Sequence, residues 1–347
     1  MSGEHVIDTR QDSGRLPTVV EGLRRFIDVK RIEAAIPRSI RSPGLEFRGY
    51  ERIGGLTNRN YKVYLGTETL VLRLPGRGTG RFINRSVERA NQEAAARAGF
   101  TPPPLYFDGR TGVKISRYLH EARALDGSLA REAGSRKEAA ALLSHFHRSG
   151  IRFVNDFDVF RTAKIYERVA RSRFARFFED FGKIRIRVFG LKERLAAGAP
   201  RAVACHNDLV PENFLLTDEG LTLIDWEYSG MNDPYWDLSS FLLESGCDSA
   251  QEKDFLACYL GRPVIPRDLA RIEAYKLLQD FLWSLWSLLQ ETANRDPRKA
   301  RSYREYGRYR FERSLSRLEA VEAGFGSTIK HSRHPFKIAD KRSEGDR

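Results

Sequence analysis

The sequence has very little cysteine, and it lacks any long hydrophobic run. Its 347 residues include 3 cysteines, Cys205, Cys247 and Cys258, which lie far apart without metal-ligand spacing. This pattern excludes a disulfide framework and a zinc finger, so we expect reduced, mostly buried thiols in a cytoplasmic protein. No apolar stretch approaches the ~18 residues of a transmembrane segment. The polar N-terminus also lacks the apolar core of a secretory signal.

Acidic residues are outnumbered by basic ones, with 46 Asp and Glu against 59 Lys and Arg and a formal net charge of +13. Such an excess can serve nucleic acid or an anionic membrane. Here it is concentrated in two segments, 161–194 and 295–317, and no nucleic-acid-binding motif accompanies them. We interpret both segments as helices with solvated basic faces, and we expect no nucleic-acid partner.

The segment 206–236 contains an acid–amide–acid pattern. Its motif H-x-D-x-x-x-x-N supplies Asp208 and Asn213, and a second acid, Asp225, follows after an apolar–turn–apolar stretch. That stretch predicts a hairpin whose turn is Asp218-Glu219-Gly220. Because a hairpin brings its two ends together, the oxygen atoms of the three polar side chains can converge on one place.

Phosphoryl transfer requires such a set of oxygen atoms. One acid accepts the proton of the attacking hydroxyl, while an amide oxygen and a second carboxylate hold Mg²⁺ against the phosphates. We therefore predict that Asp208 is the proton acceptor and that Asn213 and Asp225 bind Mg²⁺. Taken alone, Asp208 could be a helix cap, but the combined spacing is that of a kinase catalytic loop.

The region before this motif predicts an antiparallel sheet. Five strands are expected, at residues 47–53, 61–65, 70–74, 105–108 and 113–116. A helix is expected at 85–98. The turn after the first strand contains Gly54 and Gly55, and its backbone N–H groups can approach phosphates because glycine has no Cβ. A glycine pair is also common in ordinary hairpin turns.

At these residues the sequence resembles the choline/ethanolamine kinase family, which is related to the aminoglycoside phosphotransferases. The resemblance covers about residues 54–286 and includes G-G-L-T-N-x-x-Y-K-V, the catalytic loop, and Asp225-Trp226-Glu227 in place of the Asp-Phe-Gly of protein kinases. It implies an α+β, two-lobed protein-kinase-like fold. The N-lobe would be a five-stranded antiparallel sheet plus one helix, and the C-lobe would be mostly helical with the catalytic-loop hairpin.

On this basis the chain divides into four parts. They are a disordered N-terminus (1–16), a nucleotide-binding N-lobe (17–118), a catalytic and acceptor-binding C-lobe (119–325) and a flexible tail (326–347). Helical periodicity in the C-lobe predicts helices at 138–148, 162–181, 189–197, 252–260, 268–291 and 298–323. Asp237 is interpreted as a helix cap and, by resemblance, as an acid that steadies the catalytic loop.

The resemblance also implies how ATP is bound. The phosphates would be covered by the glycine turn, namely Gly54, Gly55, Thr57 and Asn58. Arg73 would occupy the position of the kinase strand-three lysine, where a guanidinium can bind phosphates bidentately; the alternative is a surface arginine. The following helix should carry the acid that pairs with Arg73, with Glu88 the first choice and Glu93 the second. Backbone groups around Ser116 and Tyr118 would read the adenine.

Two tryptophans indicate the acceptor. On a helix with about 100° per residue, Trp283 and Trp286 lie beside the apolar stripe of the segment 275–291. Two rings at i and i+3 form an aromatic wall, which attracts a quaternary ammonium by ~0.5–2 kcal/mol per contact. Packing against another helix or loop is the structural alternative.

The family resemblance adds three residues to this pocket. Glu227 and Tyr228 resemble the family's Glu-Tyr pair, and Glu244 stands at the spacing of its choline-facing acid. The resemblance implies that Tyr228 and Glu244 help the tryptophans to hold the cation. Glu227 would also contact Mg²⁺ through water.

These residues predict an ATP- and Mg²⁺-dependent kinase that phosphorylates the hydroxyl of choline or a closely related amino alcohol. The alternatives are an ethanolamine, thiamine or aminoglycoside kinase of the same fold, and an inactive kinase-like binding module. The tryptophans suit a compact cation, whereas a polyamine sugar would need a more acidic surface. The intact Asp208, Asn213 and Asp225 disfavour the inactive module. The sequence leaves open whether the chain forms a homodimer.

Overall fold

The computed structural model describes residues 30–37, 40, 46–55, 58–76 and 79–331. The chain divides into two compact units, and each is described by itself. The first unit consists of Met1–Gly76 and Pro104–Tyr118, and the second of Arg77–Pro103 and Leu119–Arg347. The expected N-lobe therefore ends with the first unit, at Tyr118, whereas residues 77–103 group with the second unit. The expected disordered segment 1–16 lies outside the described residues.

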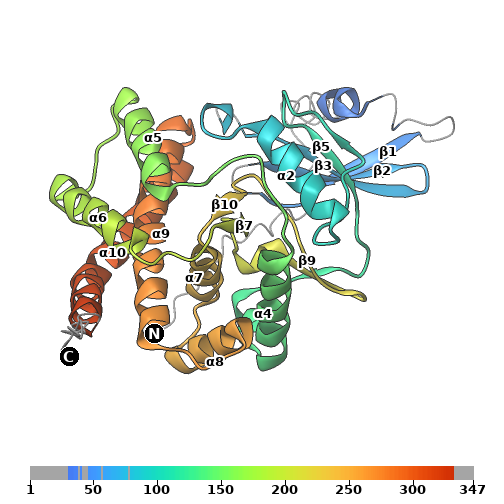
Figure 1. The fold of residues 1–347 in the computed structure, drawn as a ribbon. Helices are drawn as coiled ribbons and strands as arrows, with labels where there is room; N and C mark the ends of the chain where they lie inside the picture. Colours follow the sequence, from blue (N-terminus) through green and yellow to red (C-terminus); the bar gives the residue numbers. More distant parts are fainter. Residues whose placement is uncertain (1–29, 38–39, 41–45, 56–57, 77–78, 332–347) are drawn as a thin grey trace, which may run out of the picture. The chain divides into compact units, whose positions relative to one another are not determined.

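The first unit is built around the predicted five-stranded antiparallel sheet, with the strand order β1-β2-β3-β5-β4 (Figure 1). The strands are β1 (Phe47–Arg52), β2 (Arg59–Leu65), β3 (Glu68–Leu74), β4 (Tyr106–Phe107) and β5 (Lys114–Arg117). Alternate residues of the central strands, such as Val63 and Leu72, are buried in a small core that also takes Ile32 from a helical turn at 30–35. The period of two along the strands thus gives one buried face.

The second unit is mostly helical (Figure 1). Its helices are α2 (Arg85–Arg97), α3 (Gly127–Arg131), α4 (Ala133–Arg148), α5 (Val159–Ser172), α6 (Phe181–Ala196), α7 (Pro234–Ser245), α8 (Ser249–Leu260), α9 (Pro266–Ala293) and α10 (Pro297–His331), with short 3-10 turns at Thr79–Arg81 and Pro211–Asn213. Helix α9 is central, because it is buried on every face from Ala274 to Leu289 and packs against α5, α7 and α10.

Local sequence signals set several of these helix ends. Asp158, Asp233 and Asp248 each accept backbone N–H bonds from the first turn of α5, α7 and α8. Helices α7 and α8 end at Gly246 and Gly261, which adopt the left-handed conformation that favours glycine.

The helix boundaries predicted between residues 172 and 189 are wrong. The helix expected at 162–181 ends at Ser172, and the next begins at Phe181 instead of residue 189. Phe174 and Asp180 between them have positive φ angles of 56° and 53°, so the chain reverses here. Phe178 still packs in the core within this turn, which continues the apolar spacing and hides the break from periodicity.

At the other end of the chain, α10 continues to His331, past the expected start of the tail at residue 326. Residues 332–347 lie outside the described part of the chain. None of the helices in the described ranges is both long and apolar enough to cross a membrane.

Short strands complete the second unit. β7 (Val203–Cys205) pairs with β10 (Gly230–Asn232), and β6 (Arg123–Ala124) pairs with β8 (Phe214–Thr217), which pairs with β9 (Gly220–Leu223). The β8–β9 hairpin confirms the prediction at 214–224. The three cysteines are free thiols, but only Cys205 is fully buried and Cys258 is exposed, so the expectation of mostly buried thiols is only partly met.

Candidate active site

The hairpin brings the predicted catalytic residues together in the second unit. β7 leads into the loop that carries Asp208 and Asn213, and the N–H of Ile224, at the end of the hairpin, donates to the Asn213 carbonyl at 3.0 Å. Asp225, the next residue, therefore lies beside the end of the loop that carries Asn213. Asn207 and Asp225 adopt left-handed backbone conformations, with φ of 67° and 66°, which are costly for residues other than glycine and are typical of functional sites.

Asp237 fixes the backbone of this loop. Its buried carboxylate in the first turn of α7 accepts the N–H groups of His206 at 2.8 Å and Asn207 at 2.7 Å. The interpretation of Asp237 as a helix cap is therefore wrong, because Asp233 is the N-cap of α7. The steadying role implied by the resemblance agrees with this geometry.

His147, Cys205 and Asp237 form a buried cluster behind the loop. Their candidate ligand atoms lie within 4.8 Å of one another, which is short enough for a metal site. However, the His147 ring bonds through Nε2 to Asp237 at 3.1 Å and through Nδ1 to the Tyr259 hydroxyl at 2.8 Å. Since both ring nitrogens have protein partners, we interpret the cluster as a hydrogen-bonded support of the loop.

The electrostatic surroundings of Asp208 suit a proton acceptor. Burial raises the pKa of its carboxyl well above its usual range, and the charges of Asp225, Glu227 and Glu244 raise it further, while Arg310 opposes them. A carboxylate with a raised pKa accepts a proton more readily at neutral pH.

The same acids would accommodate a divalent cation. The Asn213 amide N–H₂ donates to the Asp208 carbonyl at 2.8 Å, which leaves the amide oxygen as the ligand atom. With the Asp225 carboxylate, this gives the hard oxygen donors that Mg²⁺ prefers. A cation there would also relieve the repulsion among the neighbouring carboxylates.

Glu227 and Glu88 are joined through one arginine. Arg85 Nη1 lies 2.6 Å from Glu88 and 2.9 Å from Glu227, and its Nη2 donates to Thr79 at 3.0 Å. This network ties α2 to the segment that follows Asp225. The predicted partner of Glu88, Arg73, belongs to the other unit, and their pairing stays a prediction.

In the first unit, Arg73 is buried rather than exposed, so the alternative of a surface arginine is wrong. Its Nη2 donates to the Gly112 carbonyl at 3.2 Å, and its guanidinium lies 5.3 Å from the centre of the Phe107 ring. These contacts fix the guanidinium on β3. A fixed cation on this strand is compatible with the predicted phosphate contact.

The described part of the predicted glycine turn in the first unit requires glycine. Gly54 and Gly55 have φ of 78° and 98°, and a Cβ on Gly55 would lie 2.2 Å from the Asn58 carbonyl oxygen. Only glycine fits this position, because any side chain would collide with the Asn58 carbonyl. Thr57 lies outside the described residues.

The proposed adenine contacts lie on β5 and just beyond it. Ser116 pairs with Val71 in the sheet, and the Tyr118 N–H donates to the Thr69 carbonyl at 3.0 Å. That N–H is therefore already used within the sheet, and any backbone contact with the base must come from other groups of this segment.

Aromatic rings form a continuous cluster in the second unit. Trp283 lies edge-to-face with Tyr228, with ring centres 5.5 Å apart, and with Trp286 at 6.3 Å. Trp286 in turn contacts Tyr303 at 5.8 Å and Tyr306 at 6.3 Å. The aromatic wall predicted from two tryptophans thus extends over five rings from three segments.

The predicted position of the tryptophans beside an apolar stripe is wrong. Because α9 is buried all round, including Gln279 and Ser284, the tryptophans do not lie outside a single apolar stripe. The tyrosines on α10 were missed, although they share the i, i+3 spacing of Trp283 and Trp286. They reach α9 because Gly307 allows close packing, since a Cβ there would lie 1.7 Å from the Ser287 hydroxyl oxygen.

Glu244 is already ion-paired. The Arg310 guanidinium on α10 contacts Glu244 on α7 through Nη2 and Asp280 on α9 through Nη1, the latter at 2.8 Å. The predicted choline-facing acid is therefore held by a protein cation.

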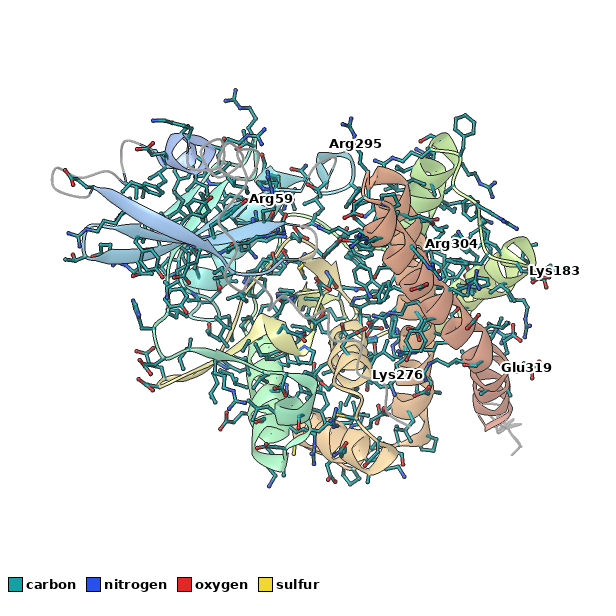
Figure 2. The ribbon with its side chains drawn as sticks, turned by 180° about the vertical axis from the view of Figure 1, so that it is seen from behind. Arg59, Lys183, Lys276, Arg295, Arg304 and Glu319 are labelled. Atoms are coloured by element: carbon teal, nitrogen blue, oxygen red, sulfur yellow. The ribbon has the colours of Figure 1, made fainter. Side chains whose placement is uncertain are left out.

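Several residues of the basic faces are ion-paired where the structure describes them. Arg171 and Glu167 lie 2.9 Å apart on α5, and Arg187 on α6 lies 2.7 Å from Glu322 on α10. Figure 2 shows Lys183 on α6 and Arg304 on α10 at the surface of this region. These pairs agree with solvated helix faces.

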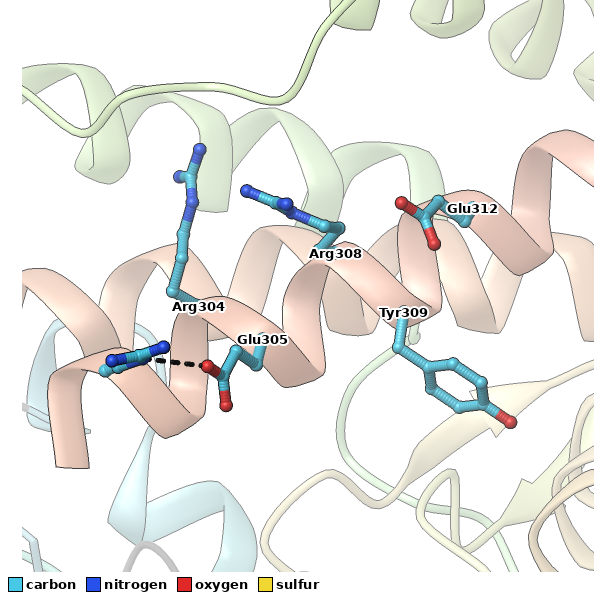
Figure 3. Close-up of a pocket in the computed structure, with 6 residues that line it drawn as sticks. Arg304, Glu305, Arg308, Tyr309 and Glu312 are labelled. Atoms are coloured by element: carbon cyan, nitrogen blue, oxygen red, sulfur yellow. Dashed lines mark hydrogen bonds and ion pairs between the residues drawn. The ribbon is translucent and has the colours of Figure 1, made fainter. Parts of the chain in front are cut away.

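The outer face of α10 bears a shallow pocket of about 380 Å³ (Figure 3). It is lined by Arg301, Arg304, Glu305, Arg308, Tyr309 and Glu312. Arg301 and Glu305 are ion-paired at 2.9 Å. None of the predicted site residues lines this pocket, so it is separate from the candidate active site.

The hairpin joins the loop with Asp208 and Asn213 to Asp225, and the aromatic cluster lies in the same unit. The chain is a small-molecule kinase. The family model for choline/ethanolamine kinase matches residues 51–260, and the chain belongs to this family.

Individual relatives agree with this assignment. Protein LicA of Haemophilus influenzae is 30% identical over 256 residues, covering 70% of this chain and 73% of LicA. The crystal structure of choline kinase LicA from Streptococcus pneumoniae is 32% identical, covers 86% of this chain and 99% of its own, and has a TM-score of 0.72. A LicA structure in complex with AMP has a TM-score of 0.73 at 32% identity, covering 86% of this chain and 99% of that one.

An aminoglycoside 2'-phosphotransferase shares the fold alone. It is 16% identical, with a TM-score of 0.57, and covers 87% of this chain and 99% of its own.

Proposed function

We propose that this protein transfers the γ-phosphoryl group of ATP to the hydroxyl of choline, giving phosphocholine and ADP. The observation that carries this proposal is the aromatic cluster in the unit that also holds Asp208, made of Tyr228, Trp283, Trp286, Tyr303 and Tyr306. Ring faces attract a quaternary ammonium, which offers no N–H group for a hydrogen bond. The similarity to choline kinase LicA supports the same substrate.

In this proposal Asp208 accepts the proton of the choline hydroxyl as the new oxygen–phosphorus bond forms. Its raised pKa supports that role. Asn213 and Asp225 hold Mg²⁺, which neutralises charge on the phosphates when bound. Glu227, whose carboxylate is held by Arg85 at 2.9 Å, is proposed to contact the metal through water.

The nucleotide contacts are assigned to the first unit and to α2. Arg73 and the turn with Gly54, Gly55 and Asn58 bind the phosphates; the positive φ angles of the two glycines support a turn whose backbone N–H groups can approach a phosphate. Glu88 is proposed to pair with Arg73. A LicA structure that holds AMP supports binding of an adenine nucleotide.

We also propose that the protein acts in the cytoplasm. The three free thiols of the protein suit a reducing compartment, and the reaction requires ATP.

The test is a substrate panel with ATP and Mg²⁺. Choline, ethanolamine, thiamine and an aminoglycoside are compared by kcat/KM, with ADP release and the phosphorylated product measured in the same samples. We expect the highest kcat/KM for choline. A preference for an aminoglycoside, or ADP release without phosphocholine, would overturn the proposal.

A further inference from the structure

Arg310 is a buried arginine that none of the catalytic roles uses. It lies on α10 with 3% of its surface exposed. Each arm of its guanidinium has a different partner: Nε contacts the Tyr306 hydroxyl at 2.9 Å, Nη1 contacts Asp280 at 2.8 Å, and Nη2 contacts Glu244. A planar guanidinium with partners on three sides is held in one orientation.

Asp280 does not depend on Arg310 alone. Two further arginines of α10, Arg313 and Arg317, lie 3.2 Å and 3.6 Å from its other carboxylate oxygen. For Glu244, in contrast, Arg310 is the cation that the structure brings into contact within the described residues. Loss of the Arg310 charge would therefore release Glu244, while Asp280 would keep two cations.

Glu244 and Arg310 lie at the acceptor region. Tyr306, which bonds to Arg310, belongs to the aromatic cluster through its contact with Trp286. Glu244 and Arg310 also act in opposite directions on the pKa of Asp208, so both are within electrostatic reach of the catalytic acid. The Glu244 side chain is 20% exposed and faces solvent or a ligand over that part of its surface.

We infer that Arg310 is a specificity-determining residue: it engages the Glu244 carboxylate and so favours a quaternary over a primary ammonium head group in the acceptor. This inference rests on the proposed function. Arg310 does not touch the reacting atoms and acts through Glu244.

The physical reason lies in the hydration of the two head groups. A primary ammonium has three N–H donors, and removing them from water without an acceptor is costly. A trimethylammonium has no N–H donor and is bound well by ring faces. Arg310 engages the carboxylate that could accept N–H bonds, so the pocket offers aromatic faces to both head groups. Transfer from water into this pocket therefore costs choline less free energy than ethanolamine.

The experiment compares kcat/KM for choline and ethanolamine in wild type and in Arg310→Met. Met keeps an unbranched apolar side chain of similar length but removes the charge. We expect the ratio of kcat/KM for ethanolamine to that for choline to rise about tenfold, as for one added hydrogen bond to a charged group. The gain should come mainly from a lower KM for ethanolamine. An unchanged ratio in a folded variant would overturn the inference.

Two further variants distinguish release of the Glu244 carboxylate from a general loosening of the contacts between α10 and α9. Arg313→Met also removes a partner of Asp280 from α10 but not one of Glu244, and we expect it to leave the substrate ratio unchanged. Arg310→Met combined with Glu244→Gln removes the released carboxylate as well, and its ratio should return close to that of wild type. A raised ratio in either variant would contradict the role of Glu244.

Glu244→Gln alone keeps the inference testable if Arg310→Met does not fold. Removing one negative charge should raise KM for both cations to a similar extent, without changing the substrate ratio. A selective loss of ethanolamine activity would show that Glu244 already binds ammonium groups in the wild type, which contradicts the inference. If the wild type phosphorylates neither alcohol, the proposed function itself is wrong, whatever the variants do.

Discussion

Asp208 in the catalytic loop and Asp268 at the start of α9 carry the same side chain in the same unit, but their pKa values are shifted in opposite directions. Burial, together with neighbouring acids, raises the pKa of Asp208 well above its usual range. Burial also works to raise the pKa of Asp268, yet hydrogen bonds from Arg262, the Ile265 N–H and Tyr235 lower it overall. The difference lies in the partners that the fold supplies.

Asp268 is fully provided with donors. Arg262 reaches it with both terminal nitrogens at 2.7 and 2.9 Å, the Tyr235 hydroxyl lies at 2.5 Å, and the Ile265 N–H lies at 2.9 Å. The Asp208 carboxylate has no hydrogen bond or ion pair to another side chain within the ranges that the structure describes. A buried acid left among like charges marks a functional site, whereas a saturated acid stabilises the fold.

Replacing Asp208 with Asn should give the largest effect on activity. We expect kcat to fall by about 10²- to 10⁴-fold because the proton acceptor is lost. Thermal stability at neutral pH should be unchanged or higher, since ionisation of an acid with a raised pKa costs stability at that pH. Steady-state kinetics and a melting curve on the same preparation measure both quantities. A large drop in melting temperature would mean that Asp208 is structural.

Asp225→Asn should have the next largest effect on activity, because it should weaken the binding of Mg²⁺. Mutation of a residue that only supports a metal ligand typically lowers metal affinity by roughly 10- to 100-fold. Loss of a carboxylate ligand itself should lower the affinity for Mg²⁺ by at least as much. Excess Mg²⁺ should therefore restore part of the activity. The measurement is kcat as a function of Mg²⁺ concentration. A titration curve that matches the wild type would remove Asp225 from the metal site.

Asp268→Asn is the matched structural change. It should leave kcat near the wild-type value but lower the free energy of unfolding by about 1–3 kcal/mol at neutral pH, since charge-assisted hydrogen bonds are lost. Because the pKa of Asp268 is lowered in the folded protein, its contribution is present above the ordinary aspartate pKa and disappears as the pH falls through the folded-state value. Denaturant unfolding at pH 7 and at about pH 2, well below the ordinary aspartate pKa, measures this difference. A stability gap that does not shrink in acid would contradict this assignment.

Trp283→Ala and Trp286→Ala should have smaller effects on binding. We expect each to raise the KM for choline by about 2- to 30-fold, the range of one cation–π contact, with less change in kcat. The loss should be larger for choline than for ethanolamine, because ring faces bind a trimethylammonium better than a primary ammonium, so removing a ring costs choline more binding free energy. Kinetics with both alcohols test this. Equal losses, or loss of folding seen by circular dichroism, would mean that the two rings only fill the core.

The sequence predicts the hairpin beside the proposed catalytic loop because its pattern is local. A hairpin with a polar turn lies between Asn213 and Asp225, so spacing alone brings them together. The sheet of the first unit follows for the same reason. Asp237 was misread as a cap because only the fold shows that its carboxylate accepts the N–H groups of His206 and Asn207.

The contacts of the acceptor region are harder to predict from the sequence. Tyr303 and Tyr306 lie on a helix whose composition is dominated by charge, and nothing local indicates that they meet Trp286. The pairing of Arg310 with Glu244 joins residues 66 positions apart on two helices. Both contacts depend on how closely α10 packs on α9, which Gly307 permits and which no periodicity reveals.

The most direct measurement is product formation from choline, ATP and Mg²⁺, followed by phosphorus NMR for wild type and Asp208→Asn side by side. The account predicts equal amounts of phosphocholine and ADP from the wild type, and almost none from a folded Asp208→Asn variant over the same time. ADP without phosphocholine from the wild type, or equal product from both proteins, would contradict it.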